Sequence, residues 1–256
     1  MTGAATLAAA LALLAPAVAG ASRATASLAI AAWPARVVVA APGRTTIHVD
    51  NPGNELVVLD AAPSGYELDL RGKPQLHNAT ALGPWLTVRP SHVAVRARST
   101  ATFSVAVARP PGARPGDHAF VVMLTTRLPS GRKVLARLRI GVVVVVRVPG
   151  VVVRRLALGA LRVERQGHRL LVAVAVANRG TLDEWIARRR LVIRLVQRGR
   201  LVATLQAEPR RLLARTGGLV ETGYTGHARG GLSAVVLLRS PRPGVAVLRR
   251  TFRLRL

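Results

Sequence analysis

The stretch from Trp85 to Thr126 constrains the fold more than any other part of the chain. Within it, Phe103, Val105 and Val107 alternate with small or hydroxylated residues, which is the two-residue period of a half-buried β-strand. Turn sequences rich in proline and glycine, at residues 110–112 and 115–117, separate this strand from the next apolar run. Strands joined in this way predict an all-β, immunoglobulin-like sandwich, in which any function lies on faces, edges or loops.

A repeated pattern predicts two such sandwiches. Residues 46–53 (TIHVDNPG) and 172–180 (VAVAVANRG) are both alternating strands that end in Asn-x-Gly. In each turn we expect the asparagine to bond to nearby backbone and the glycine to adopt a positive φ. We place the boundary at Val148-Pro149-Gly150, because a proline cannot donate to a sheet ladder. The predicted organisation is a signal peptide over 1–26 and two immunoglobulin-like domains over 27–149 and 150–256.

The same alternation predicts the individual strands. They are expected at residues 28–31, 35–40, 44–50, 55–61, 86–89, 92–97, 101–108, 118–127, 133–148, 153–165, 168–177, 190–197, 200–206, 219–223, 232–239 and 245–255. One segment has a different pattern: Thr181 and Glu184 have the spacing of a capping box, which predicts a short helix from Leu182 to Arg190.

The net charge of +27 does not by itself indicate nucleic-acid binding. Lys73 and Lys133 are the only lysines, so the basic residues are almost all arginine, as in proteins of GC-rich genomes. They are spread along the chain, and only 3% of residues are aromatic, so few side chains are available for bases to stack on. We expect a solvated basic surface with no specific nucleic-acid partner. Attraction to an anionic wall or membrane surface is compatible with this charge.

The N-terminus predicts export. Residues 4–19 form a nearly continuous apolar run, and small residues at several A-x-A positions provide cleavage sites. The first three residues lack the usual basic charge, so an uncleaved anchor is the alternative to a cleaved signal peptide. The chain contains no cysteine, which excludes disulfides, thiol nucleophiles and cysteine-ligated clusters.

No pattern in the chain points to catalysis. The six histidines are scattered singly, so neither a metal nor another cofactor is expected. Glu67 and Asp69 share a face if residues 66–70 form a strand, but they lie in an edge segment flanked by glycine and proline. Ser233 lacks the second glycine of a nucleophile elbow. We therefore predict that the protein is not an enzyme.

The motifs of the first domain carry a family resemblance. Trp33-Pro34, Pro42-Gly43, the first Asn-x-Gly strand, Trp85-Leu86-x-Val88-x-Pro90 and the segment closing on Val148-Pro149-Gly150 resemble Gram-positive WxL-interacting proteins. The resemblance implies an immunoglobulin-like, peptidoglycan-binding first domain. Members of that family end in a transmembrane helix, whereas this sequence ends in Arg253-Leu254-Arg255-Leu256, which favours a secreted or wall-held product. A more distant similarity links the first domain to periplasmic pilus chaperones.

The similarity to pilus chaperones implies candidate binding residues. In those proteins an arginine on the first strand and a lysine on the last strand of the first domain hold the carboxylate of the pilin. Arg36 occupies the first position, and Lys133, Arg137 or Arg139 can supply the second. A guanidinium group suits this task because it binds a carboxylate with two parallel hydrogen bonds.

The three tryptophans are further candidates. Trp85 is expected in the core, since other large side chains are scarce. For Trp33 and Trp185 we favour packing in a core or between the domains, and the alternative is exposure for stacking on sugars or for contact with a partner.

Two functional hypotheses remain. The first is an exported, extracellular or wall-associated binding protein that recognises cell-wall polymer or a surface protein. Polymer would be held by arginine-rich faces, above all after Gly150, where 22 basic and 5 acidic residues give +17. A surface protein would add a strand to an exposed sheet edge. The second hypothesis is a chaperone-like assembly factor for surface or pilus subunits.

Overall fold

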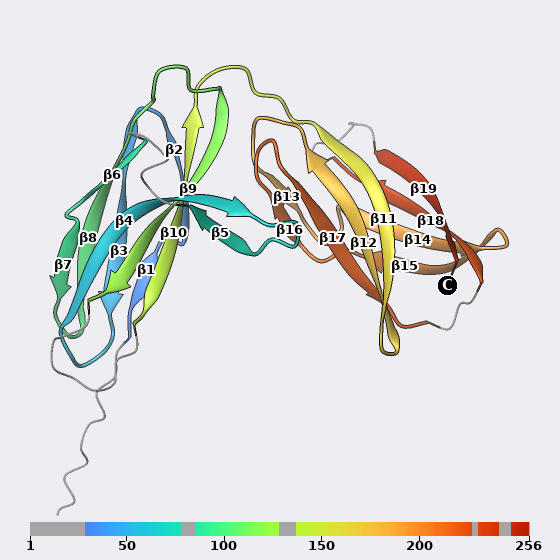
Figure 1. Cartoon of the computed structure of the whole chain (residues 1–256), viewed down its shortest axis with the longest axis horizontal. Helices are drawn as coiled ribbons and strands as arrows, with labels where there is room; N and C mark the ends of the chain where they lie inside the picture. Colours follow the sequence, from blue (N-terminus) through green and yellow to red (C-terminus); the bar gives the residue numbers. More distant parts are fainter. Residues whose placement is uncertain (1–28, 78–84, 128–136, 227–229, 241–246, 256) are drawn as a thin grey trace, which may run out of the picture.

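The protein consists of strands that form two β-sandwiches (Figure 1). The computed structural model describes residues 29–77, 85–127, 137–226, 230–240 and 247–255, and the predicted signal segment lies outside them. Over these residues every regular element is a strand, and no helix is long and apolar enough to cross a membrane. The predicted all-β, immunoglobulin-like fold is therefore confirmed.

The first sandwich packs two sheets face to face. One has the strand order β1-β3-β8-β6, and the other has the order β2-β10-β9-β4-β5, with β7 paired to β4. Their strands are β1 (Ala31–Trp33), β2 (Arg36–Ala40), β3 (Gly43–Asn51), β4 (Val57–Leu68), β5 (Pro74–His77), β6 (Leu86–Arg89), β7 (His92–Val95), β8 (Ser99–Val107), β9 (Gly116–Thr126) and β10 (Arg139–Val148). Alternate residues point inward, so Phe103, Val105 and Val107 lie in the core as the sequence predicts.

The N-terminal strands connect the two sheets of this sandwich. β1 pairs antiparallel with β3 in one sheet, whereas β2 pairs parallel with β10 in the other. Only the second half of β10 is covered in this way, because β2 pairs with Val143 to Arg147. The first half of β10 pairs only with β9 among the described strands.

The second sandwich has its own core. A sheet with the order β11-β12-β17 packs on a sheet with the order β15-β14-β18-β19, and a two-stranded ribbon joins β13 to β16. The strands are β11 (Leu156–Gln166), β12 (Arg169–Asn178), β13 (Glu184–Ile186), β14 (Leu191–Gln197), β15 (Arg200–Gln206), β16 (Arg210–Leu212), β17 (Gly217–Tyr224), β18 (Gly231–Leu238) and β19 (Leu248–Arg255). The limits 27–149 and 150–256 stay a prediction.

The predicted helix from Leu182 to Arg190 is wrong. Residues 184–186 form β13, which pairs with β16. Glu184 does not cap a helix, because its buried carboxylate accepts hydrogen bonds from Arg154 at 2.6 Å and Arg190 at 3.1 Å. Thr181 instead accepts a hydrogen bond from the Val153 amide at 2.9 Å. Ion pairs and strand pairing with distant residues thus override the local capping pattern. The sequence also missed β5 and β16, which are only four and three residues long.

The two Asn-x-Gly turns have matching hydrogen bonds. Asn51 and Asn178 are both 1% exposed, and each accepts a hydrogen bond from the glycine amide two residues later, at 3.1 and 3.0 Å. Their side-chain amides donate to backbone carbonyls of neighbouring loops, as Asn178 does to Leu182 at 2.8 Å. The expected positive φ is wrong, because neither glycine has one. Gly180 is required for space, since a Cβ there would lie 2.5 Å from the carbonyl oxygen of Val153.

We predict that Asn178→Ala destabilises the second sandwich. The substitution leaves buried carbonyl groups without a donor, which costs about 2–3 kcal/mol. Chemical denaturation measures the free energy of unfolding, and Gln166→Ala, at an exposed position, is the control. Equal stabilities of the two variants would contradict this role of Asn178.

Candidate functional site

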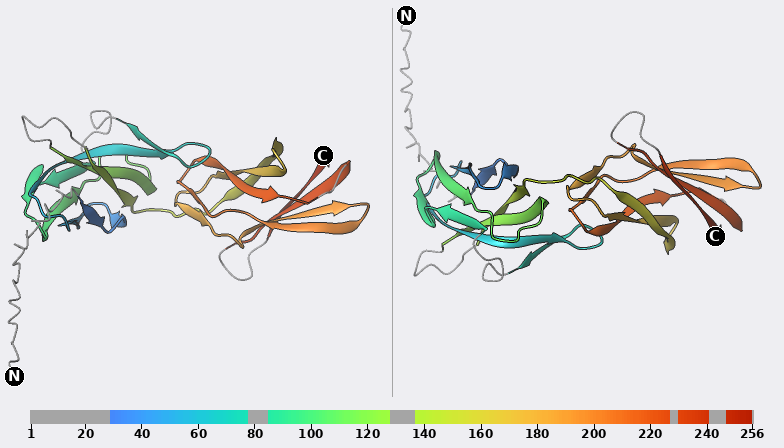
Figure 2. Two further views of the ribbon diagram at one scale, coloured as in Figure 1. Left: turned by 90° about the horizontal axis from the view of Figure 1, so that it is seen from below. Right: turned by 90° about the horizontal axis from the view of Figure 1, so that it is seen from above.

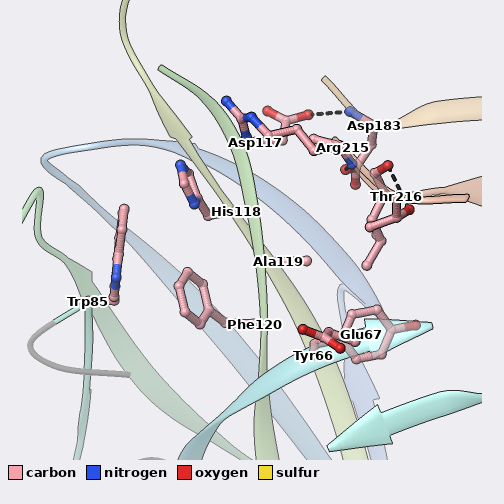
Figure 3. Close-up of a pocket in the computed structure, with 12 residues that line it drawn as sticks. Tyr66, Glu67, Trp85, Asp117, His118, Ala119, Phe120, Asp183, Arg215 and Thr216 are labelled. Atoms are coloured by element: carbon pink, nitrogen blue, oxygen red, sulfur yellow. Dashed lines mark hydrogen bonds between the residues drawn. The ribbon is translucent and has the colours of Figure 1, made fainter. Parts of the chain in front are cut away.

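The end of the first sandwich faces the end of the second (Figures 1 and 2), and residues of both line the pocket between them, which we call the cleft. The cleft contains a cavity of about 330 Å³. One side is aromatic, with Trp85, His118 and Phe120, while Asp117, Asp183 and Arg215 lie at the junction with the second sandwich (Figure 3). The cavity is further lined by Tyr66, Glu67, Ala119, Leu213, Ala214 and Thr216.

Asp117 joins the two sandwiches at this cleft. Its side chain is 1% exposed and receives two hydrogen bonds from Arg147, at 2.7 and 3.0 Å, across the β9–β10 pair. The carboxylate also accepts a hydrogen bond from the backbone amide of Asp183 at 3.0 Å. The Arg147 pKa is raised, chiefly by its hydrogen bond to Asp117. One buried carboxylate therefore holds a strand of the first sandwich and a loop of the second.

The backbone next to Asp117 contacts the backbone of the second sandwich so closely that position 116 has no room for a side chain. The Asp117 amide donates to the Thr181 carbonyl at 2.7 Å. Gly116 has a φ of +112°, and a Cβ on it would lie 2.1 Å from the same carbonyl oxygen. Arg215 adds a further link by donating to the carbonyl of Pro115. These contacts fix the two sandwiches at a short joint.

Arg36 lies at the second link across the cleft. It begins β2 and forms an ion pair with Asp183, whose side chain is 6% exposed. The other oxygen of Asp183 accepts the Ala214 amide at 2.9 Å. The pKa of Arg211 is lowered, chiefly by burial and then by the positive charge of Arg36, so a second guanidinium group lies near this ion pair.

The β4–β5 hairpin makes a third link. Its turn extends to the second sandwich, where the Leu219 amide on β17 donates to the Leu70 carbonyl at 2.7 Å (Figure 1). Arg210 donates to the same carbonyl at 2.6 Å. Arg71 lies 3.5 Å from Glu221 and 3.8 Å from Glu164. The hairpin turn is thus bonded to β17 and to Arg210 of the second sandwich.

The half-covered β10 strand borders this site. The Val143 amide donates to Ala35 at 3.0 Å and the Ala41 amide donates to Arg147 at 2.9 Å, so odd-numbered residues of β10 direct their N–H and C=O groups toward β2. By the same alternation, Arg139 and Gly141 direct these groups to that side, where no strand pairs with them within the described ranges. An extended segment can add to the sheet there.

The predicted site residues are only partly brought together. Arg36 reaches the cleft, but Arg139 lies four residues from Val143, the partner of Arg36, which places it about 13 Å away along the strand. Arg137 is exposed just before Arg139, and Lys133 lies outside the described residues. The basic residue of β10 that reaches the cleft is Arg147, at the opposite end of the strand.

The expected packing of two tryptophans is wrong. Trp33 is 51% exposed, stacks on His48 with ring centres 3.9 Å apart, and donates to Asp50 at 3.2 Å. Trp185 is 48% exposed and lies 5.2 Å from the guanidinium carbon of Arg211. Trp185 therefore lies beside the arginines of the cleft, whereas Trp33 lies on the sheet β1-β3-β8-β6 of the first sandwich. Trp85 packs against the first core, as expected.

Four residues of the cleft were not predicted from the sequence: Asp117, Asp183, Arg147 and Arg211. One signal was available, because the chain has 11 acidic residues against 38 basic ones. Because arginines greatly outnumber carboxylates, each acidic residue is expected to have several arginine side chains around it. The carboxylate pair considered for acid–base chemistry does not form: Glu67 lies 3.2 Å from His77, and Asp69 accepts the turn amides of Arg71 and Lys73. Among the described residues no cluster of three potential metal ligands is present.

Comparisons with known proteins identify the fold. No protein-family model and no curated protein matches the sequence. A chain from the chaperone–tip adhesin complex of CFA/I fimbriae matches with a TM-score of 0.52 and 9% identity, over 87% of this chain and 98% of that one. The CupB2 chaperone of Pseudomonas aeruginosa matches with a TM-score of 0.44 and 16% identity, over 88% and 100% of the two chains. The periplasmic chaperone SfaE gives 0.46 and 12%, over 88% and 98%.

The structural neighbours support only one of the two family resemblances found in the sequence. The chain shares its fold with a chain of a fimbrial chaperone–tip adhesin complex, in agreement with the more distant similarity noted above. The comparisons give no support to the resemblance to WxL-interacting proteins or to binding of peptidoglycan and wall polymer. At such low identity the likeness concerns the fold alone.

We predict that Asp117→Ala loosens the joint between the sandwiches. The substitution removes both hydrogen bonds to Arg147 and the acceptor of the Asp183 amide, and we expect a loss of about 2–3 kcal/mol in unfolding free energy. Small-angle scattering should show a wider distribution of molecular dimensions. Asp60→Ala is the matched control, because its ion pair with Arg127 is exposed and is expected to contribute less than about 1 kcal/mol. If both variants behave alike, Asp117 is not the joint.

Proposed function

We propose that this chain is an exported, non-enzymatic assembly factor that binds a surface or pilus subunit. The observation that carries the proposal is the half-covered strand β10. β2 occupies its second half, and the backbone groups of Arg139 and Gly141 face a side with no described strand. A subunit segment that lacks its own partner strand satisfies these groups by pairing with β10. The fold shared with a fimbrial chaperone–adhesin complex supports the same proposal.

The position and direction of β2 determine where the bound partner segment must end. A partner strand beside residues 139–142 is collinear with β2 and stops where β2 begins, at Arg36. If the partner runs parallel to β10, its carboxyl end arrives at this arginine. Arg36 pairs with Asp183, and the charges of both act on Arg211, whose guanidinium group also lies over Trp185. A C-terminal carboxylate at this point supplies the negative charge that a second guanidinium group can bind. The partner of this proposal is therefore a protein with an extended C-terminal segment.

Strand pairing and charge account for the proposed binding without a chemical reaction. Export is part of the proposal because the N-terminal apolar run predicts a signal segment. The exposed Trp185 beside Arg211 adds an aromatic and arginine surface of the kind that dominates protein interfaces.

Arg139→Pro tests the strand pairing. The proline removes the N–H group that faces the open side and leaves the pairing of neighbouring residues with β9 in place. Co-purification with surface proteins encoded beside the gene should fall at least about tenfold, the equivalent of one lost backbone hydrogen bond to a desolvated partner. Arg139→Gln, which removes only the charge, should bind normally. Equal losses in the two variants would show that charge, and not strand addition, holds the partner.

The carboxylate anchor is tested by a double substitution. Arg36→Gln with Asp183→Asn neutralises both members of the buried ion pair, so neither member is left as an unpaired charge. A partner peptide with a free C-terminus should bind this variant about 10- to 100-fold more weakly than the unmodified protein. The same peptide with a C-terminal amide should bind both proteins equally. Unchanged affinity for the free carboxylate would remove Arg36 from the proposed anchor.

A further inference from the structure

The sheet β15-β14-β18-β19 extends to the end of the second sandwich remote from the first (Figures 1 and 2). Strand pairing places Arg194 of β14 in a row with Val235 of β18 and Thr251 of β19. Alternate residues of each strand share the outer face of the sheet, while their neighbours fill the core. We call it the basic sheet face; its members are Val192, Arg194, Val196, Leu201, Thr204, Gln206, Ser233, Val235, Leu237, Arg249, Thr251, Arg253 and Arg255.

The four arginines of this face, all exposed, have no carboxylate among its members. All five carboxylates after Gly150 form ion pairs elsewhere. Glu164 and Glu221 pair with Arg71, Asp183 pairs with Arg36, Glu184 pairs with Arg154 and Arg190, and Glu208 pairs with Arg188. Among the described residues, these four arginines therefore have no acidic side chain on their own face to neutralise them. This charge favours an anionic partner.

Aliphatic side chains accompany these arginines. Val192, Val235 and Leu237 are only half-buried in the middle of the face. At its margin the β14–β15 hairpin exposes Leu201 by 61% and Val202 by 40%, directly after the exposed Arg198 and Arg200. A hydrated polyanion gains nothing from such side chains. A bilayer surface accepts both kinds, because guanidinium groups bind lipid phosphate while aliphatic groups enter the boundary of the acyl chains.

We infer that the basic sheet face docks the protein on the surface of an anionic phospholipid bilayer. The arginines of β19 contact the headgroup phosphates, and the β14–β15 hairpin inserts Leu201 and Val202 between headgroups. The inference is independent of the proposed subunit binding, since β10 and the cleft lie on the other sandwich and at its joint.

Vesicle flotation of the full chain tests this inference. The probes are phosphatidylcholine vesicles with and without phosphatidylglycerol, in a salt series. Substituting glutamine for Arg249, Arg253 and Arg255 together should weaken binding to the phosphatidylglycerol vesicles by about 100-fold, the order expected for three arginines at an anionic surface. The matched control places glutamine at Arg44, Arg89 and Arg96, which are exposed on the first sandwich and give the same net charge. An equal loss in the control would overturn the inference in favour of non-specific attraction.

A second pair of variants separates a bilayer from free phosphate. Leu201→Ser with Val202→Ser leaves the charge unchanged and should weaken vesicle binding several-fold, because two inserted side chains are lost. Leu56→Ser with Leu76→Ser, at exposed positions of the first sandwich, should have no effect. If the hairpin variant binds vesicles normally, or if inorganic phosphate displaces the protein as well as added vesicles do, the face is a phosphate site and the bilayer inference fails. Thermal unfolding checks that all variants are folded.

Discussion

The arrangement of the two sandwiches depends on one buried carboxylate. Asp117 accepts two hydrogen bonds from Arg147 in its own sheet and one from the amide of Asp183 in the second sandwich. Through Asp183, the same network reaches Arg36 at the start of β2. Because burying a carboxylate is costly unless its oxygens are paired, these partners are all needed for the joint to be stable. The cleft and the Arg36 cluster follow from this joint.

The arginine excess has different consequences in different places. At the cleft it surrounds a few carboxylates, and the resulting ion pairs fix the orientation of the loops. On the outer sheet of the second sandwich it has no carboxylate partner on the face, and the positive charge is available to something outside the chain. The same excess of arginine therefore stabilises the cleft through ion pairs and leaves the basic sheet face positively charged.

Strand order explains why binding is proposed at β10 and not elsewhere in the first sandwich. The opposite edge of that sheet is used internally, since β5 and the hairpin turn contact the second sandwich through Leu70. β10 is half covered by β2, which leaves residues 139–142 as an open side next to a basic cluster. The proposed partner strand can therefore pair with the backbone of residues 139–142 and end at the guanidinium group of Arg36.

The sequence by itself determined most of the longer strands and their core positions, because alternation is a local property: Phe103, Val105 and Val107 could only be buried on one face of a strand. It also predicted that Asn51 and Asn178 bond to nearby backbone, as they do with the glycine amides two residues along the chain, but not the bonds of their side-chain amides to distant loops. It could not determine the cleft, where Arg36 meets Asp183 across 147 residues, or the strand β13, which long-range pairing with β16 selects over a helix. Arg139 was placed on the correct strand but at the wrong end, and Arg137 lies before β10 begins. Only the parallel register with β2 decides which part of β10 faces Arg36. Register and joint geometry are set by contacts distant in sequence, and these exist only in the tertiary structure.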